Sequence, residues 1–446
     1  MVVRRIVGIV RNPAQLVLAA FVVLILVGTA LLSLPFAYDP GTSYDLSDSL
    51  FWATSAATIT GLGTIEFTSF SLFGELVVLV LIQLGGFGIM TIGSVFALVA
   101  SRRIGLRRRM LAQAEIGAVD IGELRSLISA IAKITFAVEA TIALILFAHL
   151  AADDDIGLVD AAYSGIFHGV SAFNNAGVSL YPDNLTQFAD DPIVVFPITV
   201  AFVIGGLGFP VLVEFGRRIR PRRWSLHTRI TVFATLVLLA FGPIMVLTLE
   251  WTNPATLGPM NIWDKVEAAW FQGVSPRTAG FRTIETGAMR EQTLNIITGL
   301  MFVGAGPAST SGGIKVTTFA VLGFAMWAEV RGDSDVNVFN RRLPPAVIRQ
   351  AMTVALMSVG VVFGTAVLLK TISPYSFTQT AFEAASAFGT AGLSTGITDA
   401  LPMLGRMVLV VVMLAGRVGP ITFVTALALR ERRRAYRYPE ERPIIG

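Results

Sequence analysis

The sequence lacks cysteine and contains few charged residues. Without cysteine there are no disulfide bonds, thiolate nucleophiles or thiolate metal sites. Charged residues make up 14% of the 446 residues and hydrophobic residues 54%, whereas soluble domains usually carry about 25% charged residues. So few charges cannot cover the surface of a soluble protein of this length. The composition therefore indicates an integral membrane protein.

Long apolar runs take the place of the missing charges. About 20 apolar residues span the hydrocarbon core of a bilayer as a helix. Runs of this kind lie at 16–34, 76–100, 193–213, 231–249, 352–369 and 407–429. The first run is longer than the apolar part of a signal peptide and is followed by similar runs, so we expect it to stay in the protein as a membrane helix.

Basic residues gather in short segments beside these runs. They lie at 4–11, 102–109, 217–229, 331–349 and 430–437, and acidic linkers lie between them at 39–48 and 153–160. Arginine and lysine are enriched in the cytoplasmic loops of membrane proteins. We therefore expect a multi-pass protein of the plasma membrane, the inner membrane in bacteria, with both termini in the cytoplasm. The lipid bilayer explains the basic charge, and no nucleic-acid partner is expected.

One sequence pattern occurs four times. A short segment rich in small residues leads into a glycine at Gly61, Gly177, Gly280 and Gly392, at intervals of 116, 103 and 112 residues. A serine stands six residues before the glycine in three copies and five residues before it in the third. A second glycine cluster begins 24 to 28 residues downstream of each glycine. Each short segment has about ten to twelve residues, too few to span a bilayer, so we expect it to enter the membrane and return.

These repeats predict the fold class. We expect an all-α integral membrane protein in which residues 1–446 form a single transmembrane domain of four parallel units. Each unit contains a spanning helix, a re-entrant pore helix and a second spanning helix. About eight spanning helices and four pore helices would surround a pseudo-fourfold axis normal to the membrane, because every unit starts and ends on the same side. The units cover 12–110, 120–225, 226–342 and 345–435.

Four glycine turns on one axis suit the passage of a cation. Rings of backbone carbonyls can replace the hydration shell of a cation, and glycine adopts the dihedrals that turn carbonyls toward the axis. The C-terminal ends of the four short helices would add negative potential at the same place. Close helix packing is the alternative explanation for the glycines. The expected filter consists of Thr58, Ile59, Thr60, Gly61, Asn174, Asn175, Ala176, Gly177, Arg277, Thr278, Ala279, Gly280, Gly389, Thr390, Ala391 and Gly392.

The four turn motifs resemble the filters of a known family. The motifs TITGL, NNAGV, RTAGF and GTAGL, which begin at residues 58, 174, 277 and 389, resemble those of the Trk/Ktr/HKT superfamily of potassium transporters. The resemblance covers essentially the whole chain and implies potassium uptake through a single-file pore like that of a potassium channel, with K⁺ bound at the filter residues. Glycine in all four turns resembles the potassium-selective members. A less selective potassium and sodium transporter remains the alternative.

The start of the first unit resembles one branch of this family. The first apolar run begins near residue 16, which resembles the Ktr-type membrane subunit. That resemblance implies a homodimer docked on a cytosolic ring of nucleotide-binding regulatory subunits, with Na⁺ as an activating ion. It implies no organic cofactor in this chain.

A segment rich in glycine and serine interrupts the third unit at 304–315. Proline removes a backbone donor and glycine weakens a helix, so we expect the helix to break and its middle to cross the ion path. The segment resembles the gating loop of the family, and Arg417 resembles an arginine of its last helix. A simple kink, and for Lys315 an extension toward the cytoplasmic surface, are the alternatives. The expected gate consists of Gly304, Gly306, Pro307, Ala308, Ser309, Thr310, Ser311, Gly312, Gly313, Lys315 and Arg417.

Charged residues near the short helices have structural interpretations. We expect Asp48, Asp160 and Asp264 to cap the N-termini of pore helices. Glu383 is expected to be a hydrogen-bonded group behind the fourth filter turn. The arginines Arg277 and Arg282 would repel a cation, so we expect their side chains to point away from the axis, toward Glu285 or Glu383.

Two other classes of function compete with a cation pore. An ion-coupled secondary transporter for small solutes also uses broken helices, but it predicts inverted or twofold repeats, whereas these repeats are fourfold and parallel. A membrane-embedded enzyme is not expected, because the chain has no cysteine, no suitably spaced carboxylate pair and only His149, His168 and His227 as histidines.

Overall fold

The computed structural model describes residues 13–109, 121–217 and 221–419. The basic segments predicted at 4–11 and 430–437, and the outer ends of the first and fourth predicted units, lie outside them.

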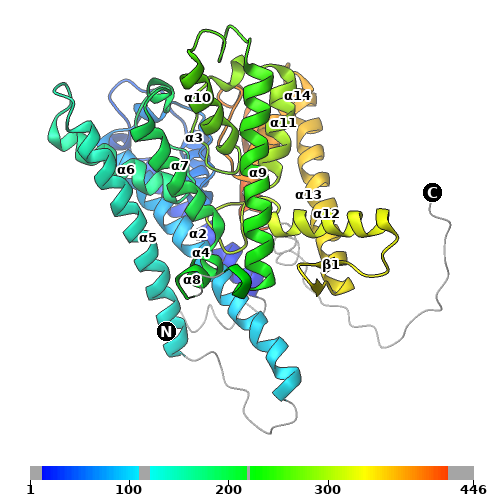
Figure 1. The fold of residues 1–446 in the computed structure, drawn as a ribbon. Coiled ribbons are helices and arrows are strands. Elements are labelled where there is room, and N and C mark those ends of the chain that lie inside the picture. The colour runs from blue at the N-terminus through cyan, green and yellow to red at the C-terminus, as the bar shows by residue number, and fades with distance from the viewer. Residues whose placement is uncertain (1–12, 110–120, 218–220, 420–446) are drawn as a thin grey trace.

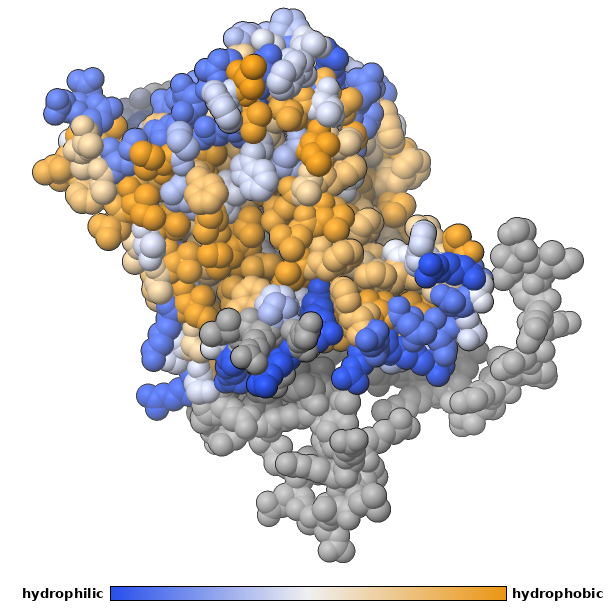
Figure 2. Space-filling model, viewed as in Figure 1, coloured by the Kyte–Doolittle hydropathy of each residue, from blue (hydrophilic) through white to orange (hydrophobic). Residues whose placement is uncertain are grey.

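The described chain is almost entirely helical. Its long helices are α2 (Pro13–Leu32), α4 (Leu72–Arg109), α5 (Ile121–Leu150), α9 (Leu226–Glu250) and α13 (Pro345–Ile372), which run in roughly the same direction in Figure 1. Figure 2 shows hydrophobic residues in a broad band across the middle of the visible face, with hydrophilic residues at both ends. A continuous apolar surface of this kind suits contact with lipid.

Five helices in the described part of the chain are long and apolar enough to span a membrane, and six if a bent pair is counted as one span. About eight spans were expected. The bent pair is α7 (Pro192–Leu207) with α8 (Phe209–Arg217), which meet at 97°. The break falls at Gly208, whose φ of +90° is open to glycine but strained for other residues.

The two other expected spans do not appear as single long helices, each for its own reason. The second helix of the predicted third unit is divided into α11 (Glu291–Phe302) and α12 (Val316–Arg331), and α12 lies crosswise to α9 in Figure 1. The last helix, α15 (Met403–Val418), has 16 residues within the described range, and the rest of the predicted run 407–429 lies outside it.

Four short helices occupy the stretches where pore helices are expected. They are α3 (Leu46–Thr58), α6 (Leu158–Phe173), α10 (Ile262–Val274) and α14 (Phe377–Gly389). At 13 or 16 residues, none is long enough to cross a bilayer. Each packs against the long helix that precedes it, in the pairs α2 with α3, α5 with α6, α9 with α10 and α13 with α14.

The caps of these short helices correct one prediction. The N-cap residues are Asp45, Gly157, Asn261 and Ser376, whereas the expected caps Asp48, Asp160 and Asp264 stand in the first helical turn. An N-cap requires a non-helical backbone, which these three aspartates do not have. Asp45 and Asp48 form a reciprocal capping box at the start of α3. Hydrogen bonds from the Ser47 side chain and the Asp48 backbone N–H lower the pKa of the Asp45 carboxyl.

Short helical turns and one hairpin lie in the connections between the helices of the described chain. Single turns of 3₁₀ helix lie at η1 (Pro35–Ala37), η2 (Phe67–Ser69), η3 (Thr186–Phe188), η4 (Pro221–Arg223) and η5 (Thr286–Ala288). After α12 a small hairpin pairs β1 (Asn337–Val338) with β2 (Arg341–Arg342), with Asn337 opposite Arg342.

Candidate functional site

Each short helix ends in a turn with an unusual backbone. The glycines of the four turns, Gly61, Gly177, Gly280 and Gly392, have φ between +66° and +84°. The residue two places earlier also has a positive φ, of 56° at Ile59, 60° at Asn175, 70° at Thr278 and 50° at Thr390. A β-branched residue rarely adopts this conformation. Non-glycine residues held there cost about 1–3 kcal/mol each and cluster at functional sites.

The four turns meet at one place. A Cβ atom on Gly177 would lie 2.5 Å from the Cα of Gly280, and one on Gly280 would lie 3.4 Å from the Cα of Gly392. A Cβ atom on Gly392 would in turn lie 3.4 Å from the Cα of Gly61. These positions leave no room for a side chain, so the backbones of the turns approach one another directly.

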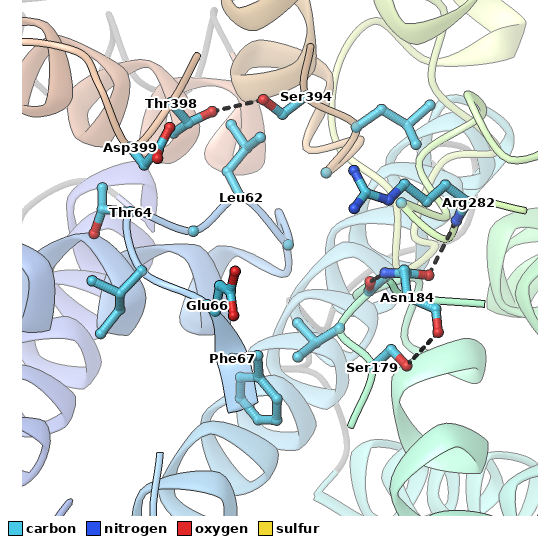
Figure 3. A pocket seen from close by; sticks show the side chains of 18 of the residues that line it. Leu62, Thr64, Glu66, Phe67, Ser179, Asn184, Arg282, Ser394, Thr398 and Asp399 are labelled. Atoms are coloured by element: carbon cyan, nitrogen blue, oxygen red, sulfur yellow. Dashed lines mark hydrogen bonds between the residues drawn. The ribbon is translucent and has the colours of Figure 1, made fainter. Parts of the chain in front are cut away.

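A cavity of about 340 Å³ opens on one side of the four glycines. This cavity, here called the vestibule, is lined by the four glycines, by residues that follow them in each turn and by Trp52 (Figure 3). The carboxylates of Glu66 and Asp399 line it, as does the guanidinium of Arg282. Arg282 donates to Glu285 at 3.3 Å, as expected, but it lies in the vestibule wall.

A non-helical segment lies on the other side of the turns. This crossing segment, 303–315, joins α11 to α12. Thr310 Oγ1 donates to Asn175 Oδ1 at 2.8 Å, beside the second turn. A Cβ atom on Gly312 would lie 2.5 Å from Oγ1 of Thr390, beside the fourth turn. The segment therefore contacts the N-terminal sides of two turns, whereas the C-terminal sides line the vestibule.

The crossing segment is also attached to α7. The N–H of Gly306 donates to Gly206 O at 2.8 Å, and the N–H of Thr310 donates to Gly205 O at 3.3 Å. A Cβ atom on Gly205 would lie 3.0 Å from Oγ1 of Thr310. Gly205 and Gly206, which belong to the second glycine cluster of the predicted second unit, thus allow the close approach of the segment.

Arg417 and Lys315 both contact this segment. The Arg417 side chain is 2% exposed, and its guanidinium donates to Thr310 O and, at 3.3 Å, to Gly85 O. Lys315 Nζ donates to Ser311 O at 2.5 Å, so its side chain turns back into the segment instead of extending toward a membrane surface. Of the remaining expected gate residues, Ser309 Oγ donates to Gly306 O at 2.6 Å.

Several expected filter residues direct their side chains away from the meeting point. Asn174 donates to Gln83 on α4 and to Glu139 on α5. Arg277 is buried and donates to Thr235 O on α9. The backbone of each turn, and not these side chains, is therefore what the four turns bring together.

Two residues behind the second turn were not predicted. Asn184 donates from Nδ2 to Gly177 O at 2.9 Å and accepts the N–H of Arg282 at 3.1 Å, which joins the second turn to the third (Figure 3). Glu139 is 5% exposed. An acidic residue within a long apolar run is itself a signal of function and could have identified Glu139, whereas Asn184 lies in a polar loop that carries no such signal.

Comparison with known proteins decides the family. The sequence model of TrkH, described as a cation transport protein, matches residues 8–435. The chain belongs to the TrkH family. Its membership agrees with the resemblance inferred from the turn motifs, and a transport family with this many apolar helices is a multi-pass membrane family.

Relatives of this TrkH-family chain are named as uptake proteins. It is 39% identical to the Ktr system potassium uptake protein B of Bacillus subtilis, over 98% of this chain and 97% of that protein. It is 31% identical to the potassium/sodium uptake protein NtpJ of Enterococcus hirae, over 98% of this chain and 97% of that protein. These relatives are named as transporters and not as enzymes.

A solved structure shares the fold. The potassium transporter TrkH from Vibrio parahaemolyticus aligns with a TM-score of 0.74 at 19% identity, over 94% of this chain and 85% of that one.

Proposed function

We propose that this chain is the membrane subunit of a potassium uptake system and that K⁺ passes in single file through the four glycine turns. The observation that carries the proposal is the meeting of four strained turns between the vestibule and the crossing segment. Irregular backbone at membrane depth is tolerated where it lines a path for water or ions. The names of the relatives support K⁺ as the ion.

The turns suit a cation for two further reasons. The C-terminal ends of α3, α6, α10 and α14 lead directly into the turns, so their dipoles favour a positive charge there. The buried hydroxyls Oγ1 of Thr278 and Thr390 have no hydrogen-bond partner. Buried hydroxyls normally have one, and a bound cation or its water would supply it.

The crossing segment and Arg417 are proposed as the gate. The segment contacts the turns on the side away from the vestibule, and Arg417 places a positive charge on it. In this proposal the four units surround a pseudo-fourfold axis, the vestibule faces outward, and the termini and basic loops are cytoplasmic. A homodimer of this chain would be regulated by a cytosolic nucleotide-binding ring, which the Ktr system names of the relatives support.

Uptake of ⁸⁶Rb⁺, a tracer for K⁺, into proteoliposomes of the purified chain tests the proposal. The expected result is uptake that unlabelled K⁺ abolishes. Absence of uptake, with and without a Ktr-type cytosolic subunit, would overturn it. Na⁺ gives the second comparison: competition by Na⁺ as strong as that by K⁺ would favour a potassium and sodium transporter, as NtpJ is named, and stimulation would make Na⁺ an activator.

A further inference from the structure

The four short helices share a feature that the glycine alignment does not reveal. Each contains a fully buried phenylalanine, followed at the fourth place by serine, in the sequences FWATS, FHGVS, FQGVS and FEAAS that begin at residues 51, 167, 271 and 382. The residue directly after the phenylalanine differs in every copy. These four residues are Trp52, His168, Gln272 and Glu383.

All four variable residues are buried, and each forms a hydrogen bond with the corresponding segment of its own unit. Their exposure is 3%, 2%, 0% and 0% in chain order. Each bonds to the segment that leaves the turn after its glycine, here called the exit segment: 62–65, 178–179, 281–283 and 393–398. The exit segments form the wall of the vestibule or adjoin it.

In the first and second units the bond uses an aromatic ring nitrogen. Trp52 Nε1 donates to Ile65 O at 3.2 Å. His168 Nε2 lies 3.0 Å from Ser179 Oγ, while its Nδ1 lies 2.8 Å from Ser164 O. The imidazole is thereby fixed at both nitrogens.

In the third and fourth units the bond uses an oxygen. Gln272 Oε1 accepts the N–H of Thr283 at 3.3 Å. Glu383 accepts from Ser394 Oγ at 2.7 Å and from the N–H of Thr395 at 2.9 Å, and its other oxygen accepts from Thr398 Oγ1 at 2.8 Å. Ser394 and Thr398 face the vestibule (Figure 3).

We propose that Trp52, His168, Gln272 and Glu383 are positioning residues that hold the four exit segments and so set the preference of the filter for K⁺ over Na⁺. The inference rests on the proposed function. A carbonyl ring discriminates between ions through the spacing and number of its dipoles. An exit segment that is free to move lets the carbonyls contract around the smaller ion. Because the four bonds are chemically different, one can be removed without altering the others.

The experiment compares variants at Glu383 and Trp52 in proteoliposomes. Glu383→Leu fills the same space without an acceptor, Glu383→Gln keeps one acceptor oxygen but no charge, and Trp52→Phe removes the indole N–H. Thr380→Val and Thr54→Val are matched controls, because each threonine is buried in the same short helix as the residue tested and its hydroxyl bonds only to carbonyls of that helix or its N-cap residue. The readout is the Na⁺ concentration that halves ⁸⁶Rb⁺ uptake, together with KM and maximal rate for Rb⁺.

The expected result is a fall of about fivefold in the preference for Rb⁺ over Na⁺ in Glu383→Leu and Trp52→Phe, which corresponds to about 1 kcal/mol. Glu383→Gln and both controls stay within about twofold of the wild type. An unchanged preference in Trp52→Phe, or an equal loss in the controls, would overturn the inference. So would a loss in Glu383→Gln as large as in Glu383→Leu, because the charge would then be decisive.

Two safeguards keep the outcomes separate. If Glu383→Leu does not fold, as judged by gel filtration and thermal unfolding, Trp52→Phe decides. If wild-type protein takes up no ⁸⁶Rb⁺, the proposed function fails, whereas normal uptake with unchanged preference in the variants defeats this inference alone.

Discussion

At the residue scale, the glycines of the four turns and their neighbours carry different constraints. The glycines need both a left-handed backbone and the absence of a side chain, because the next turn is in contact with them. Ile59, Thr278 and Thr390 need the same backbone but have side chains. Surrounding contacts must therefore hold these three residues in place.

The first prediction concerns Gly177, where φ is +66° and a Cβ atom would meet the backbone of Gly280. Gly177→Ala should lower ⁸⁶Rb⁺ uptake about tenfold or more, because the added atom would lie 2.5 Å from the Cα of Gly280 and force the two turns apart; a tenfold change corresponds to about 1.4 kcal/mol. The control is Gly41→Ala, where φ is +95° but nothing lies within 4 Å of the added atom. Equal uptake by the two variants would contradict the assigned close approach.

The second prediction concerns Arg417, whose guanidinium donates to the crossing segment at Thr310. Arg417→Ala should raise uptake about tenfold in the absence of any cytosolic subunit, since a hydrogen bond from a charged group contributes about 1.5–3 kcal/mol to holding the segment. Arg349→Ala, at an exposed arginine, serves as the control. A rate equal to that of the wild type would remove Arg417 from the gate.

At the scale of the element, the crossing segment is the least regular part of the third unit. It separates α11 from α12, contacts two of the four glycine turns and is held by backbone hydrogen bonds to α7. Helix α7 itself ends at Leu207, just before the break at Gly208, and the N–H of Phe209 donates to Ala308 O at 3.1 Å. The two breaks therefore face each other, and each supplies hydrogen-bond partners to the other.

The third prediction removes the middle of this segment. Deletion of 307–312 takes away the contacts with Asn175 and Arg417 while leaving α11 and α12 intact. Uptake should rise above the wild-type rate and lose its dependence on a cytosolic subunit. Deletion of 333–334, in the exposed turn after α12, should leave the rate unchanged. A deletion variant that folds but transports at the wild-type rate would refute the gate.

At the scale of the whole molecule, orientation can be tested directly because the chain has no cysteine. Asp154 lies in the exposed turn between α5 and α6, and Asp333 lies in the exposed turn after α12. In intact cells a membrane-impermeant maleimide should label Asp154→Cys and spare Asp333→Cys, which should react only after permeabilisation. The opposite pattern would reverse the proposed orientation.

Much of this arrangement was predictable from local sequence. The four short helices and the break at 303–315 follow from segment length, glycine and proline, because these act on the backbone wherever the segment lies. Glu383 was predicted to be a hydrogen-bonded group behind the filter, and its contacts with Ser394 and Thr398 agree. Phe382 and Ser386, which flank Glu383, could also be identified in the sequence, but only the structure shows that both are fully buried.

The sequence by itself determined which elements the membrane part contains. These are helices of spanning length, four short segments that lead into glycine, and the charged residue Arg417, which needs a partner within the protein. Tertiary structure alone decided which backbone atoms meet. The left-handed conformation of Ile59, the bend at Gly208 and the path of Asn174 toward Glu139 depend on neighbours far away in the chain. No local propensity specifies such contacts, because each is stable only when the packed neighbours outweigh the cost of the strained backbone or the buried polar group.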